Sequence, residues 1–138
     1  KEQSQTDNEK WKYPFHFIDF ETMSPAIPYY KNMTPYEIFA FQFSHHTLTN
    51  NHEGEDKVQH ASEFLHTDSG SPNISFLKAL HNAIGNTGGT VFQWSPHETI
   101  VLKSMLKSPK AVASLSSDIR LPVSSKMNVA YSELVDTF

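Results

Sequence analysis

The hydrophobic pattern begins with a strongly apolar run at residues 15–20, FHFIDF, which predicts a buried strand carrying Phe15, Phe17, Ile18 and Phe20. Prolines on both sides bound the run, because proline cannot donate to a β-ladder and restricts the residue before it. Asp19 and Glu21 emerge at its far end. Residues i and i+2 of a strand point to the same face, so we expect both side chains to aim at one point.

Apolar and polar residues alternate in the next segment. Phe39, Phe41 and Phe43 predict a strand over residues 37–48, and the more polar residues 57–65 predict its return. A turn at residues 50–54 joins the two, so an antiparallel three-strand meander is expected.

The second half of the chain changes to a helical period. Ser71 and Pro72 predict the start of a helix, which carries an apolar stripe and ends at Gly85. The stripe consists of Ile74, Leu77, Leu80, His81 and Ile84. Residues 90–94 then predict a short buried strand, and a helix between two strands usually means a parallel neighbour. The carboxyl ends of this strand and the first would meet at one sheet edge, where open α/β sheets place their sites.

Composition bounds the class of protein. With 138 residues and 38% hydrophobic content the chain is one globular domain's worth, and without cysteine it has neither disulfides nor a thiolate zinc site. A net charge of −4 provides no basic footprint for nucleic acid. We expect a polar lead-in over residues 1–12, a domain over residues 13–138 and a cytoplasmic location. Because the sequence begins with Lys1 and not with Met, we also expect it to be a piece of a longer protein.

The pair Asp19 and Glu21 has two interpretations. Converging carboxylates repel, and a divalent cation is the usual remedy, for which hard oxygen donors favour Mg²⁺ or Mn²⁺. The alternative is ordinary turn chemistry, in which Asp accepts from the backbone two residues on. Histidines offer a weaker metal hypothesis: His45 and His46 are adjacent on a strand, so they point to opposite faces and cannot reach one ion.

Glu98 is similarly open to two interpretations. Ser95 and Glu98 have capping-box spacing around Pro96, and a helix with Val101, Leu102, Met105 and Leu106 turned inward follows. In the cap interpretation Glu98 reaches back to the Ser95 amide. In the other it joins a metal site at the sheet edge.

A resemblance to a known superfamily bears on both choices. Residues 19–22, DFET, after an apolar strand resemble the first motif of DEDD-type 3′–5′ exonucleases, which have a ribonuclease-H-like fold. The wider string over residues 13–44, with its prolines and FQFS at 41–44, is similar to a bacterial family of unknown function placed in that superfamily. The resemblance extends to residue 107 and places Glu98 at the second-motif acid, although WSPHE at 94–98 replaces an Asn-containing string.

The resemblance implies a ribonuclease-H-like mixed α/β sheet and a two-metal nuclease, with Mg²⁺ or Mn²⁺ held by Asp19, Glu21 and Glu98. Its substrate would be a single-stranded DNA or RNA end, on which Tyr29 and Tyr30 could stack unless they only pack the loop. The third-motif acid is not identified: Asp118 and Asp136 are candidates, but Tyr131 and Asp136 have one residue too many between them. No His follows His97, itself an irregular choice of general base. The alternative is a degenerate module that binds nucleic acid or protein. A glycosidase is disfavoured, because its paired acids come from separate elements.

Overall fold

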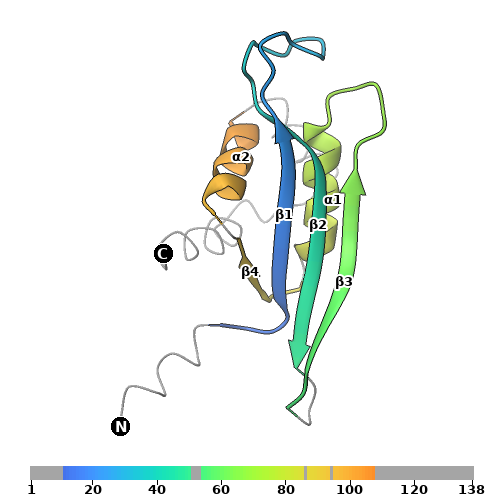
Figure 1. The fold of residues 1–138 in the computed structure, drawn as a ribbon, viewed down its shortest axis with the longest axis vertical. Coiled ribbons are helices and arrows are strands. Elements are labelled where there is room, and N and C mark those ends of the chain that lie inside the picture. Colours follow the sequence, from blue (N-terminus) through green and yellow to red (C-terminus); the bar gives the residue numbers. More distant parts are fainter. Residues whose placement is uncertain (1–10, 51–53, 86, 94, 108–138) are drawn as a thin grey trace.

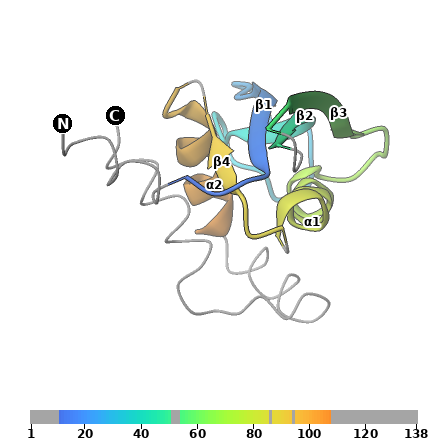
Figure 2. The ribbon, with the colours of Figure 1, turned by 90° about the horizontal axis from the view of Figure 1, so that it is seen from below.

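The computed structural model describes residues 11–50, 54–85, 87–93 and 95–107 (Figure 1). In these ranges the chain folds into an α/β unit whose elements are β1 (Phe15–Met23), β2 (Phe39–Asn50), β3 (Asp56–Leu65), α1 (Asn73–Ile84), β4 (Thr90–Phe92) and α2 (His97–Leu106). The strands form one mixed sheet in the order β3-β2-β1-β4. The two helices flank this sheet, and α2 lies beside β1 in line with the carboxyl end of β4 (Figures 1 and 2).

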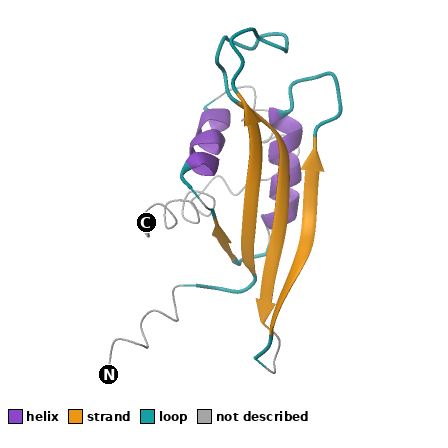
Figure 3. Ribbon diagram, in the orientation of Figure 1, coloured by secondary structure: helices purple, strands orange, loops and turns teal. Residues whose placement is uncertain are grey.

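Strand pairing confirms the expected meander and crossover. β1 pairs with β2 and β2 with β3, both antiparallel, whereas β4 runs parallel to β1. β4 is shorter than the sequence predicted, because its last ladder partner is Phe92, opposite Phe17. Beyond Phe17 the edge of β1 therefore has no strand neighbour among the described residues, and this open edge leads to the start of α2 (Figure 3).

The prediction for β1 was right about its acids and wrong about one aromatic residue. The strand runs to Met23 and carries Asp19 and Glu21 toward its far end, as predicted. Because side chains alternate, His16, Ile18 and Phe20 are buried on the helix-covered face, whereas Phe17 is 43% exposed. The sequence had suggested that Phe17 is core, since an apolar run alone does not distinguish the two faces of a strand.

A cluster of aromatic side chains forms the centre of the core. Phe76 of α1 lies edge-on to Phe20 of β1, Phe43 of β2 and Phe64 of β3, so one ring joins the helix to three strands. Val101, Leu102 and Met105 of α2 belong to the same cluster, as predicted. This core fixes the position of α2, and hence of its first turn, relative to β1.

The helix starts differ from the predicted caps. α1 begins at Asn73, its cap position is Pro72, and no side chain caps it, so Ser71 does not serve as the cap. Phe76 is fully buried on this helix although it lies outside the predicted stripe. The expected polar lead-in also differs from the prediction at its described end: Trp11 contacts Phe92 with ring centroids 5.0 Å apart.

Candidate functional site

A pocket of about 680 Å³ lies at the open edge of β1, beyond the carboxyl end of β4. This is the sheet edge at which the sequence placed a site. The pocket receives residues from three strands and from the first turn of α2. Its lining consists of Phe17, Ile18, Asp19, Phe20, Ser44, His46, Phe92, Gln93, Ser95, His97 and Glu98.

The two acids of β1 are placed differently relative to the pocket. Asp19 and Glu21 point to the same exposed face of the strand, as expected from their spacing. Asp19 lines the pocket, but Glu21, one step further along, does not. The ladder with β2 shifts register immediately after Glu21, so the strand is irregular at this point. Among the described residues, neither acid is in an ion pair with lysine or arginine.

Glu98 combines burial with an unsatisfied oxygen. The residue is only 6% exposed, it lines the pocket, and its Oε2 atom has no hydrogen-bond partner among the residues that the structure describes. The capping-box interpretation is wrong: α2 begins after Pro96 without a side-chain cap, and Ser95 Oγ instead accepts from the His97 amide at 3.3 Å. An unpaired buried polar atom costs free energy, so this oxygen is expected to have a partner such as a bound ion or a water molecule.

A histidine and an amide stand beside the acids. His97 Nε2 is 3.0 Å from Thr22 Oγ1, which ties the first turn of α2 to the end of β1. Gln93 is held by the buried Thr99, whose hydroxyl donates to its Oε1 at 2.7 Å. The first contact joins α2 to β1, and the second joins Gln93, which lies between β4 and α2, to α2. Gln93 and His97 both line the pocket, so these contacts help to shape its wall.

Part of the pocket lining is aromatic. The rings of Phe17 and Phe92 stack with centroids 5.3 Å apart and an interplanar angle of 15°. The sequence analysis missed this wall because it assigned Phe17 to the core; its i, i+2 relation to Asp19 was the signal that puts both on one face. Tyr29 and Tyr30 do not line the pocket, and Tyr30 packs edge-on against Phe39 with centroids 5.4 Å apart.

The chain matches the model of one protein family. Residues 16–137 match a domain of unknown function, DUF2779. The chain belongs to the DUF2779 family. No curated protein and no solved structure matches it. The family match covers the whole pocket and continues through Asp118 and Asp136, which lie outside the described residues.

The pocket of this DUF2779 domain has donors for a hard cation. In the described ranges no group of three or more His, Asp or Glu residues is placed to hold a metal ion. Asp19 and Glu98 nevertheless line one pocket, and Glu98 Oε2 is buried without a partner. Mg²⁺ usually keeps several waters and is bound by one or two carboxylates plus substrate phosphates. Asp19 and Glu98 are the two carboxyl side chains of this pocket that could take part in holding one such ion, together with waters and a substrate phosphate.

No helix in the described part of the chain is long and apolar enough to cross a membrane.

Proposed function

We propose that this DUF2779 domain is a metal-dependent nuclease with a ribonuclease-H-like architecture, which hydrolyses phosphodiester bonds at a single-stranded DNA or RNA end. The observation that carries the proposal is the buried, unpartnered Oε2 of Glu98 in the pocket that Asp19 lines. A buried polar atom without a partner lowers stability, and such atoms are found at functional sites where a bound ligand supplies the missing contact.

The residues around the pocket divide into two chemical groups. Asp19 and Glu98 would hold the cation, and a bound divalent cation supplies a more acidic water and stabilises charge on a leaving oxygen. The stacked rings of Phe17 and Phe92 offer a flat apolar surface to a nucleobase, and base–aromatic stacking tolerates any base. The combination suits a nucleotide, with its base against the rings and its phosphate at the acids.

The expected second ion has fewer donors. Glu21 is on the same face as Asp19 but does not line the pocket, so it would act only through a water or after a shift at the adjacent register irregularity. Asp118 and Asp136 stay candidates for the remaining acid. His97, held by Thr22, lies at the pocket wall but has no assigned role in the reaction.

Cleavage of end-labelled single-stranded DNA and RNA in Mg²⁺ or Mn²⁺ tests the proposal. We expect shortening from one end, lost in Asp19→Asn and in Glu98→Gln, and retained in Glu63→Gln, which alters an exposed acid of β3. Mn²⁺ binding, followed by electron paramagnetic resonance, should weaken in the first two variants only. No cleavage and no Mn²⁺ binding by the wild-type protein would refute the proposal.

A second function has its own support. The described residues give the pocket two carboxyl side chains and not the four acids of the resembling superfamily, and the chain carries a net charge of −4. A degenerate ribonuclease-H-like module that binds nucleic acid or a protein without cutting it fits these facts. Binding of a labelled oligonucleotide without cleavage in either metal, and unchanged by Asp19→Asn, would favour this module.

A further inference from the structure

Two histidines lie buried against each other under the sheet, away from the pocket. His16 of β1 and His45 of β2 are 1% and 2% exposed, and His16 Nδ1 is 2.8 Å from His45 Nε2. They are diagonal neighbours, because Ile18 is the residue of β1 that pairs with His45. The sequence suggested His45 only as a possible metal ligand, and nothing in the pattern pointed to His16 as its partner.

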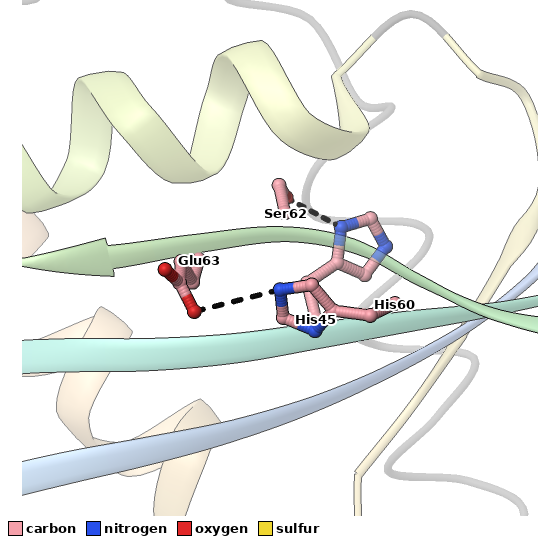
Figure 4. A network of polar contacts seen from close by, with 4 residues as sticks. All are labelled: His45, His60, Ser62 and Glu63. Carbon is pink, nitrogen blue, oxygen red and sulfur yellow. Dashed lines mark hydrogen bonds and ion pairs between the residues drawn. The ribbon is translucent and has the colours of Figure 1, made fainter.

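Hydroxyl groups extend the pair in both directions. His45 Nδ1 is 2.8 Å from Ser62 Oγ on β3, and His16 Nε2 is 2.9 Å from Thr87 Oγ1 (Figure 4 shows the Ser62 contact). Thr87 Oγ1 in turn donates to the carbonyl oxygen of Ile84, the last residue of α1, at 2.9 Å. One chain of hydrogen bonds thus crosses three strands and ends on the helix.

The chain has one direction when both imidazoles are neutral. Because the Thr87 hydroxyl donates to Ile84, it accepts from His16 Nε2–H, so His16 Nδ1 must accept. His45 therefore donates through Nε2–H, and its Nδ1 accepts from the Ser62 hydroxyl. If both imidazoles were protonated, His16 Nδ1–H would face His45 Nε2–H, and the chain of hydrogen bonds would break at its centre.

Within the described part of the chain, no acid is placed to pair with a positive charge on these two rings. Burial lowers the pKa of His16, and burial with the imidazoles of His16, His46 and His60 lowers the pKa of His45 to about 4. α1, which packs below, contains no acid. On β1, Asp19 and Glu21 point to the other face.

Glu63, an acid on β3, contacts His60 and not the buried pair. The ladder shifts register between His45 and His46, so Ser62 pairs with His45 while His60 pairs with His46. His60 Nε2 is 3.5 Å from Glu63 Oε2, a contact drawn in Figure 4 beside the Ser62 bond. No hydrogen bond connects Glu63 to either buried ring.

The His16 end of this hydrogen-bond network contacts residues 87–89, the segment that directly precedes β4. A Cβ on Gly89 would meet His16 Nε2 at 2.9 Å and the carbonyl oxygen of Pro14 even closer, so this backbone packs directly on the imidazole. The next residue, Thr90, donates its amide to the Lys12 carbonyl at 2.8 Å, and Phe92 follows two residues later in the pocket wall.

We propose that the Ser62–His45–His16–Thr87 chain is a proton-sensitive latch, which holds the segment before β4 against the sheet at neutral pH and releases β4 in acid. Release would move Phe92 and so alter the pocket wall. The latch does not depend on the pocket being a nuclease site.

Nuclear magnetic resonance of the wild-type protein tests the neutral state directly. Long-range ¹H–¹⁵N spectra at pH 7 should report the Nε2–H tautomer for both His16 and His45, and neither ring should titrate until well below the ordinary histidine pKa. Amide hydrogen exchange measures the effect of protonation on the latch. Protection of the Thr90 amide should fall at least about tenfold between pH 7 and pH 4.5. This loss should occur at a higher pH than the loss of protection at the Phe43 amide in the core.

Variants separate the latch from general acid sensitivity. Thr87→Val removes the last hydroxyl without touching the core and should lower protection of Thr90 at pH 7. Thr34→Val, which removes an exposed hydroxyl that donates to Glu37 Oε2 in the loop before β2, should leave the Thr90 profile unchanged. Ordinary titration of both buried rings, an unaffected Thr90 in Thr87→Val, or loss of protection in all strands at one pH would each overturn the proposal.

Discussion

Replacement of Glu98 by Met tests whether the unpaired oxygen of Glu98 destabilises the protein when no metal ion is bound. Glu98 is 6% exposed and its Oε2 atom has no partner, whereas Met has a similar unbranched shape and no polar oxygen. An unsatisfied buried polar group costs about 1–3 kcal/mol. In EDTA, therefore, Glu98→Met should raise the free energy of unfolding by about that amount.

The same variant should lose the response to metal. A ligand that binds only the folded state stabilises it by RT ln(1 + [L]/Kd), which is about 1.4 kcal/mol when Mg²⁺ is at ten times its Kd. Wild-type protein should gain this amount in Mg²⁺, and Glu98→Met should gain almost none. For a domain of this size each kcal/mol shifts Tm by about 4 °C, so both effects are within reach of thermal and urea unfolding followed by circular dichroism.

A matched control is available on the neighbouring strand. Glu21 is exposed and does not line the pocket, so Glu21→Gln should change the stability in EDTA by less than about 0.5 kcal/mol. The reasoning fails if Glu98→Met is less stable than wild type in EDTA. It also fails if Mg²⁺ stabilises the wild type and Glu98→Met equally, because the cation would then bind elsewhere.

Three further predictions concern the fold. Phe43 is 1% exposed and contacts Phe64 and Phe76, so Phe43→Ala should cost about 3–5 kcal/mol in urea unfolding, and a loss below about 1 kcal/mol would contradict its central position. Gly89→Ala places a Cβ against the Pro14 carbonyl and should cost about 1–3 kcal/mol or more, whereas Gly70→Ala, where a Cβ meets nothing within 4 Å, should be nearly neutral in the same thermal melts. Stability should also fall with acid: His45 has a pKa of about 4 when folded and about 6.5 when unfolded, so the unfolded chain binds more protons between these values. The free energy of unfolding should be highest above pH 6.5, and His45 should contribute a loss of about 3 kcal/mol by pH 4. The loss should be smaller in His45→Gln, in which only the lowered pKa of His16 remains, and an equal loss in that variant would contradict the reasoning.

The local pattern of the chain determined most of the secondary structure. Alternating phenylalanines predicted β2, the polar run after it predicted β3, and the change to a helical period predicted α1 and the parallel return of β4. These inferences succeed because backbone periodicity and proline chemistry act over a few residues. The i, i+2 spacing likewise placed Asp19 and Glu21 on one face before any tertiary contact was known.

Only the tertiary structure decided what those faces meet. The sequence left Glu98 between a helix cap and a pocket acid, since both need an acid in the first turn, and the position of α2 beside the open edge of β1 decided against the cap. It also assigned Phe17 to the core and left His16 without a role. Burial and partners of single side chains depend on which elements pack together, and residues far apart in the chain supply those neighbours: Phe92 for Phe17, and Thr87 for His16.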